Sequence, residues 1–215
     1  MRLIVATRNA KKGEEMLQLL APPWEPEAPL HALELWTLAA FPGLAEVEED
    51  ADTFAGNARK KAVETALALG EWTVADDSGL TVDALQGAPG VLSARFAGVH
   101  GDDAANNERL LGALVDVPPE RRGAAFVCAL CLVDPTGTVR HETQSSCRGR
   151  IIDAPRGATG FGYDPLFLIR EYHKTFAELG PIVKHQLSHR ARAVQTLRPV
   201  LERLIGTHQA ESAQA

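Results

Sequence analysis

Apolar and polar positions recur along this chain with two periods, one typical of strands and one typical of helices. Short apolar runs, rich in β-branched or small residues, predict strands at 3–6, 33–38, 72–75, 124–133 and 139–147. Apolar residues spaced three or four apart predict helices over 10–20, 53–69, 106–115 and 188–205. Alternating strands and helices favour an α/β fold, and a hairpin around Pro135, Thr136 and Gly137 makes its sheet mixed.

Turn and capping residues place the boundaries of these elements. Thr53 is suited to cap the second helix, and Gly70 is suited to end it. Ser78 and Gly79 predict a turn directly after the strand at 72–75. The chain shows no repeats and no independent second domain. We therefore expect one domain over residues 1–207 and a frayed tail over 208–215.

Composition narrows the class of protein. The chain has 215 residues, of which 45% are hydrophobic, enough for a sizeable core. No apolar run approaches the roughly 18 residues of a membrane span, and the N-terminal run is too short for a signal peptide, so we expect a cytoplasmic protein. A net charge of −6 argues against a general nucleic-acid binder, although it leaves room for a local basic pocket.

The three cysteines do not form a metal site. Cys128 and Cys131 have C-x-x-C spacing but lie within an apolar run that is typical of a strand. Positions three apart on a strand point to opposite faces, so these two thiols cannot hold one metal ion together. We interpret them as reduced core residues, and Cys147 also as reduced.

Adjacent carboxylates follow the strand at 72–75. Asp76 and Asp77 repel each other unless water, a hydrogen bond or a cation offsets their charge. Mg²⁺ prefers oxygen ligands and is a natural partner for such a pair. Taken alone, an Asp-Asp pair is more typical of a solvated turn, and only the rest of the chain shifts the balance toward a metal site.

Cations stand at the start of two predicted helices, where the helix dipole is positive. Lys11 and Lys12 open the first helix, and His189 and Arg190 follow a candidate cap, Ser188, at the last. A phosphate would offset this arrangement, and arginine is suited to bind it with two hydrogen bonds. Side chains that simply project into water are the alternative.

Residues 157–165 combine glycines with aromatic rings. The glycines allow a close backbone approach, and Phe161 and Tyr163 offer flat faces for a nucleobase. Asp164 could accept hydrogen bonds at the same site, although core packing explains Tyr163 and Asp164 better when this loop is taken alone. Together with the acidic pair and the basic helix starts, this loop favours a nucleoside-phosphate site.

With these features the chain resembles a known family, the inosine/xanthosine triphosphate pyrophosphatases. The resemblance covers nearly the whole chain, and its motifs run in family order. They are Thr7-x-Asn9-x-x-Lys12, Glu48-Glu49 before Thr53-Phe54 and Asn57-Ala58, 75–80 (ADDSGL), 87–90 (GAPG), 93–95 (SAR), 160–165 (GFGYDP), Lys184 and 188–190 (SHR). Arg8 and Lys11 replace frequent glycines of the family, and Gln86 and Phe96 are milder departures.

The resemblance implies a two-lobed α/β fold around a long mixed β-sheet flanked by helices, with the active site in the cleft between lobes. It implies a homodimer that uses Mg²⁺ to hydrolyse ITP, dITP and XTP to the monophosphate and pyrophosphate. Asp77 is implied as the general base and a metal ligand, with Glu48 as second ligand and Glu49 as its alternative. The implied substrate-binding residues are Thr7, Arg8, Asn9, Ala10, Lys11, Lys12 and Ser78 for phosphates, and Phe161, Gly162, Tyr163, Asp164, Lys184, His189 and Arg190 for the base and part of the phosphate chain.

Other functions remain open at this level. One is a related pyrophosphatase for modified pyrimidine or standard nucleotides. A second is a catalytically silent nucleotide-binding module, and a third is a purely structural protein. The third leaves the cations at two helix starts unexplained.

Overall fold

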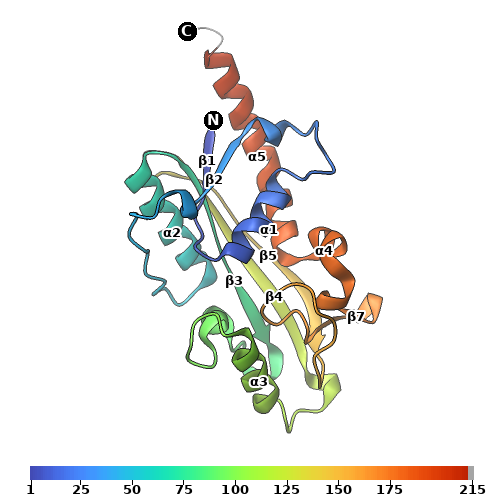
Figure 1. The fold of residues 1–215 in the computed structure, drawn as a ribbon. Helices are drawn as coiled ribbons and strands as arrows, with labels where there is room; N and C mark the ends of the chain where they lie inside the picture. Colours follow the sequence, from blue (N-terminus) through green and yellow to red (C-terminus); the bar gives the residue numbers. More distant parts are fainter. Residues whose placement is uncertain (213–215) are drawn as a thin grey trace. The chain divides into compact units, whose positions relative to one another are not determined.

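The computed structural model describes residues 1–212 and confirms an α/β fold (Figure 1). The strands are β1 (Arg2–Val5), β2 (Glu34–Thr37), β3 (Trp72–Val82), β4 (Gly123–Val133), β5 (Val139–Ile151), β6 (Phe167–Ile169) and β7 (Lys174–Thr175). The helices are α1 (Ala10–Leu20), α2 (Phe54–Leu69), α3 (Asp103–Ala113), α4 (Phe176–Leu187) and α5 (His189–Ser212), with short 3-10 turns between elements.

The strands form one mixed sheet, as the sequence predicts. Their order is β2-β1-β3-β4-β5-β6-β7. β1 pairs in parallel with both β2 and β3, whereas β6 pairs antiparallel with β5 and β7. A tight turn joins β4 to β5, and in it the backbone N–H of Asp134 donates to the carbonyl of Thr138 at 3.0 Å.

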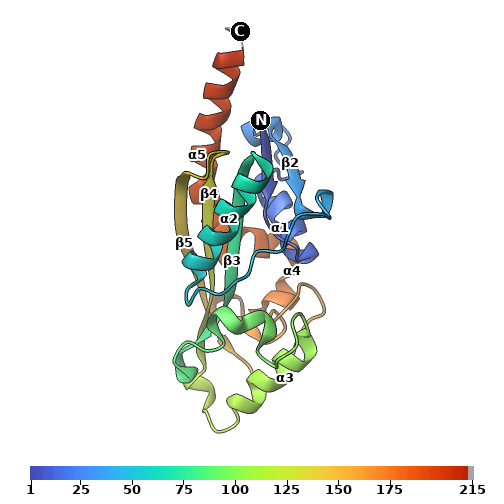
Figure 2. The ribbon, with the colours of Figure 1, turned by 90° about the vertical axis from the view of Figure 1, so that its left-hand side faces the viewer.

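The chain divides into two compact units, and β3, β4 and β5 each contribute residues to both. The first unit holds residues 1–77, 129–144 and the chain from 193 onward, and the second holds 78–128 and 145–192. In the first unit α1 and α2 lie on opposite faces of the parallel strands (Figures 1 and 2). This follows from right-handed crossovers that run in opposite directions across the sheet, from β1 to β2 through α1 and from β2 to β3 through α2.

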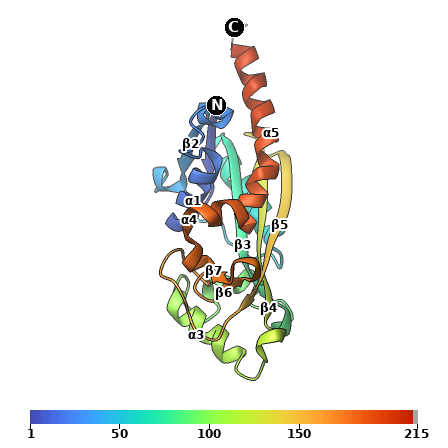
Figure 3. The same ribbon diagram turned by 90° about the vertical axis from the view of Figure 1, so that its right-hand side faces the viewer.

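Each unit has its own apolar core. In the first, small residues of α2, Ala58, Ala62 and Ala66, pack close to Ile4 of β1 and Ala75 of β3. In the second, aromatic rings fill the core between the sheet and the helices, and Figure 3 shows β6, β7 and α3 in this unit. The rings of Phe126, Phe167 and Phe176 contact one another with centroid separations of 4.6–6.0 Å.

The helix caps form as the sequence indicates. The Thr53 hydroxyl accepts a hydrogen bond from the N–H of Gly56 at 3.0 Å, and Gly70 ends α2 in the left-handed conformation at φ 66°. Ser188 caps α5 through the N–H of Ala191 at 3.1 Å. The three cysteines are free and buried, and burial raises the pKa of the Cys131 thiol to about 12, which keeps it protonated.

Three elements differ from the sequence-based expectation. β3 continues through Ser78 and Gly79 instead of turning. A Cβ on Gly79 would lie 2.4 Å from the Ser93 hydroxyl oxygen, which is why this position requires glycine. This glycine therefore serves close packing. α3 begins three residues before its predicted start, and Asp102 caps it. The sequence does not predict α4, because Gly180 and Pro181 interrupt its helical pattern.

The structure describes only part of the predicted C-terminal tail. Of the predicted tail 208–215, the first five residues belong to α5, and 213–215 lie outside the described residues. The single domain over 1–207 stays a prediction. Within residues 1–212, no helix is both long and apolar enough to cross a membrane.

Candidate functional site

The segment between β1 and α1 presents backbone N–H groups and a lysine at one helix start. Asn9 caps α1 by accepting from the N–H of Lys12 at 3.1 Å, and the Thr7 hydroxyl accepts from the N–H of Asn9 at 3.2 Å. The first turn of α1 contains no acidic residue. The remaining N–H groups and the half-buried Lys12 give this end of the helix the positive character that phosphate requires.

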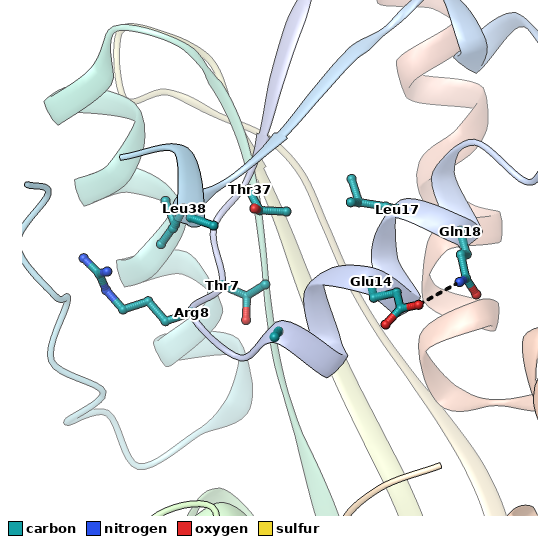
Figure 4. A pocket seen from close by; sticks show the side chains of 9 residues that line it. Thr7, Arg8, Glu14, Leu17, Gln18, Thr37 and Leu38 are labelled. Carbon is teal, nitrogen blue, oxygen red and sulfur yellow. Dashed lines mark hydrogen bonds between the residues drawn. The ribbon is translucent and has the colours of Figure 1, made fainter. Parts of the chain in front are cut away.

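A cavity of about 520 Å³ lies beside this segment, at the carboxyl ends of the parallel strands β1 and β2 (Figure 4). The side chain of Arg8 extends away from α1, and its guanidinium donates to the carbonyl of Leu44 in the loop before α2. Arg8 therefore contacts the acidic loop of residues 42–52. The cavity is lined by Thr7, Arg8, Ala10, Glu14, Leu17, Gln18, Thr37, Leu38 and Ala39.

Carboxylates gather around Lys61 of α2, and we call Glu49, Asp76, Asp77 and Lys61 the carboxylate cluster. Asp76 and Asp77 lie in the middle of β3 and are 2% and 4% exposed. The Lys61 ammonium donates to Oε1 of Glu49 at 2.5 Å and to the carbonyl oxygen of Asp76 at 2.7 Å. Asn57, one helical turn before Lys61, donates from Nδ2 to Oδ2 of Asp77 at 3.0 Å.

The charges in this cluster shift one another's pKa values. Burial raises the pKa of Asp77 and outweighs the opposing charges of Lys61 and Lys12. Burial also acts to raise the pKa of Glu49, but the charge and hydrogen bond of Lys61 lower it overall. Burial acts to lower the pKa of Lys61, yet the charges of Asp76, Asp77 and Glu49 raise it. Lys61 therefore stays protonated as the counter-charge of the cluster.

The structure brings Glu49, and not Glu48, into the carboxylate cluster. Glu49 is half-buried and bonded to Lys61, whereas Glu48 is exposed. Within residues 1–212, no group of three or more histidine, cysteine, aspartate or glutamate side chains is arranged to enclose a metal ion. Glu49 and Asp77, whose charges act on each other, still fit Mg²⁺, since this ion is commonly held by one or two carboxylates together with substrate phosphates and water.

In the second unit, Lys184 and Asp164 form a buried ion pair below the ring of Phe161. The Lys184 ammonium donates to Oδ2 of Asp164 at 2.7 Å and lies 4.6 Å from the Phe161 ring centroid. The same Oδ2 accepts the N–H of Phe161 at 3.0 Å. The Arg190 guanidinium lies 6.0 Å from this ring and donates to the Ser78 hydroxyl at 2.8 Å.

The other predicted residues of this unit differ in what they contact. His189 stacks on Phe126 with a centroid separation of 4.9 Å and an interplanar angle of 11°. Tyr163 is 3% exposed and donates its hydroxyl to the carbonyl of Ser93 at 2.9 Å, so it packs as a core residue. Gly162, at φ 61°, is held by α3, because its carbonyl accepts from Asn107 Nδ2 at 2.9 Å.

The predicted site residues thus fall into two groups. The first unit holds residues 7–12 and Asp77, and the second holds Ser78, 161–164, Lys184, His189 and Arg190. Sequence reasoning missed Lys61. The spacing along α2 could have pointed to it. Lys61 lies four residues after Asn57, so both side chains share one face of the helix, and it lies beside the buried residues of that helix. The predicted cleft and the residue roles stay predictions.

Fold and site together define a class, an α/β protein with paired carboxylates and a helix start suited to phosphate. The chain belongs to the Ham1 family, whose model matches residues 3–200. A relative from Rhodopirellula baltica, named dITP/XTP pyrophosphatase, is 53% identical over 203 residues and aligns with 94% of each chain.

Solved structures of similar proteins share this fold. A HAM1 protein from Coxiella burnetii has a TM-score of 0.82 and 34% identity, and the alignment covers 94% of this chain and 99% of that one. A structure titled nucleoside-triphosphatase / dITP/XTP pyrophosphatase, from Mycobacterium abscessus, has a TM-score of 0.72 and 46% identity, and the alignment covers 92% of this chain and 98% of that one.

Proposed function

We propose that this protein hydrolyses dITP, ITP and XTP to the nucleoside monophosphate and pyrophosphate. The observation that carries the proposal is the carboxylate cluster beside a phosphate-suited helix start in a chain of the Ham1 family. The names of relatives at 44–53% identity point to the same substrates. The protein is thus a hydrolase of nucleotide metabolism that cleaves a phosphoanhydride bond.

Asp77 is the proposed general base. Burial raises the pKa of its carboxyl, which strengthens it as a proton acceptor. Its carboxylate would accept the proton of the attacking water and keep that water oriented. Asn57 and Lys61 hold Asp77 and its neighbours in place.

Mg²⁺ is the proposed cofactor, with Asp77 and Glu49 as the residues that would hold it. Glu48 remains the alternative implied by sequence, and its exposure makes Glu49 the better candidate. When bound, the ion would supply charge to neutralise phosphate oxygens. Thr7, Asn9, Ala10, Lys11 and Lys12 would bind the phosphates through N–H groups and ammonium groups. Arg8 would contribute only if its guanidinium left the carbonyl of Leu44.

The proposed base-binding residues lie in the second unit. Phe161 offers a ring face, Tyr163 and Gly162 shape the loop, and Asp164 holds Lys184 and the N–H of Phe161. Donors from Lys184, His189, Arg190 or the backbone would pair with O6 of hypoxanthine or xanthine. Adenine presents an amino group there and would leave a donor unpaired. That mismatch costs about 1–3 kcal/mol, or roughly 10- to 100-fold in selectivity.

We further propose a cytoplasmic homodimer that acts on free nucleotides. The net charge of −6 supports a small-molecule substrate over nucleic acid. The homodimer rests on the family resemblance.

Pyrophosphate release from ITP, XTP, dITP, GTP and ATP, each with and without Mg²⁺, tests the function. We expect fast Mg²⁺-dependent release from the first three, and slow release from ATP, which lacks O6, and from GTP, which differs from ITP by a 2-amino group. Fast release from ATP or GTP would contradict the selectivity. Binding without release from any of them would instead support the silent nucleotide-binding module.

A further inference from the structure

Asn57 connects the proposed catalytic base to the acidic loop. It lies in the first turn of α2 and is 2% exposed. Its Nδ2 donates to Oδ2 of Asp77 at 3.0 Å, and its Oδ1 accepts the backbone N–H of Ala51 at 2.9 Å. One amide thus joins Asp77 of β3 to a loop position two residues after Glu49.

The loop packs closely against the helix at this point. A Cβ on Gly56 would lie 2.8 Å from the Cβ of Ala51, so the loop approaches as near as a glycine permits. Lys60 donates to Asp50 at 2.7 Å and Lys61 to Glu49 at 2.5 Å. The exposed Lys60 contact contributes little, whereas the Asn57 bond is fully buried.

Helix capping does not explain Asn57. The Thr53 hydroxyl already caps α2, and the backbone N–H of Asn57 donates to the Thr53 carbonyl at 3.1 Å. The side-chain amide is therefore not needed for the helix to begin. Its two hydrogen bonds serve only Asp77 and the loop.

We propose that Asn57 is a positioning residue that sets the orientation of the Asp77 carboxylate and docks the loop carrying Glu49 beside it. This inference rests on the proposed function, in which Asp77 and Glu49 act together. Loss of this donor removes one constraint on the orientation of the Asp77 carboxylate. A small misplacement of a reacting group costs a large factor in rate. Residues 7–12, which would bind the phosphates, are not hydrogen-bond partners of the Asn57 side chain, so we expect the affinity for nucleotide to change less than the rate.

Kinetics of Asn57→Ala with ITP test the orienting role. We expect kcat to fall by about 10- to 100-fold while KM stays within about twofold. Thr65→Ala is the matched control, because Thr65 is also buried on α2, two turns further along. It should lower the melting temperature without a comparable loss of kcat.

A double-mutant cycle separates positioning from general structural damage. In an Asp77→Asn background, Asn57→Ala should have no further effect on the residual rate, because Asn57 acts through Asp77. Independent, multiplicative losses would overturn the proposal. So would equal values of kcat in Asn57→Ala and Thr65→Ala.

Hydrogen exchange tests the docking role without any turnover. Asn57→Ala should speed amide exchange at Ala51 and its loop, and Thr65→Ala should not. Asn57→Asp gives a second variant, since its carboxylate still accepts from the Ala51 N–H but cannot donate to Asp77 when ionised. We expect it to keep the loop protected and still lose kcat.

These results distinguish a failure of the proposed function from a failure of the positioning role of Asn57. If the wild-type protein releases no pyrophosphate from ITP, the proposed function fails, while exchange at Ala51 still reports on docking. If the wild type turns over and Asn57→Ala matches it in both kcat and exchange, only the positioning role fails.

Discussion

At the scale of single residues, Asp77 carries its charge in an environment that opposes it. Burial raises the pKa of its carboxyl, despite the nearby charges of Lys61 and Lys12. A carboxyl whose folded pKa exceeds its unfolded pKa favours the folded state only while it is protonated. Ionisation at higher pH therefore lowers the free energy of unfolding.

Asp77→Asn should accordingly separate activity from stability. We expect pyrophosphate release to fall by about 100-fold or more, because the general base is lost. In the metal-free protein, the melting temperature at pH 7 should be unchanged or higher than in the wild type. This difference should shrink as the pH falls through the raised pKa of the wild-type carboxyl, where that carboxyl becomes protonated. Thermal melts across this range check the sign, and a clear loss of stability at pH 7 would contradict it.

The buried pair of Lys184 and Asp164 is a second residue-scale case. Their side chains are 8% and 2% exposed, so removal of Lys184 takes a cation away from a buried carboxylate. Lys184→Met should lower the free energy of unfolding by about 3–5 kcal/mol. The double variant with Asp164→Asn should recover part of this loss. Chemical denaturation measures both, and a single-variant loss below about 1 kcal/mol would show that the pair is well solvated.

At the scale of elements, α4 depends on one glycine for the course of its chain. Gly180 interrupts the helix at φ 75° and ψ 173°, a conformation that is open almost only to glycine. Pro181 follows it and begins the segment that carries Lys184. The break in the helix therefore sets the position of Lys184 within the second unit.

Gly180→Ala should destabilise the protein by about 1–3 kcal/mol and raise KM for ITP, because Lys184 shifts with its helical segment. Gly206→Ala in α5 is the control, since that glycine is exposed, helical and has no neighbouring atom within 4 Å of a Cβ. It should be neutral or stabilising by up to about 1 kcal/mol. Denaturation midpoints and steady-state kinetics compare the two, and equal behaviour would contradict the role of Gly180.

At the scale of the whole molecule, substrate binding should appear as added stability. A non-hydrolysable ITP analogue with Mg²⁺, at about 100 times its Kd, should raise the free energy of unfolding by about 2.7 kcal/mol. The matching ATP analogue at the same concentration should give a clearly smaller shift. Thermal-shift measurements test this, and equal shifts would place the selectivity of the enzyme in its chemical step instead of in binding.

Local signals in the sequence were sufficient for most elements. Thr53 and Gly70 delimit α2, and Ser188 begins α5, because caps and periodic apolar residues act within a few positions of each other. The same local logic failed at Gly79. There the requirement for glycine comes from Ser93, which is distant in sequence and close in space.

The sequence alone therefore determined the α/β class, the mixed sheet, the family and the residue types of the candidate site. Helix period, capping and ordered motifs are properties of short segments, and they can be identified without contacts. Only the tertiary structure decided that Glu49 joins Asp77, that Lys61 is their counter-charge and that Asn57 links them. Those choices depend on which side chains of the acidic loop, α2 and β3 meet after folding, and no single segment contains that information.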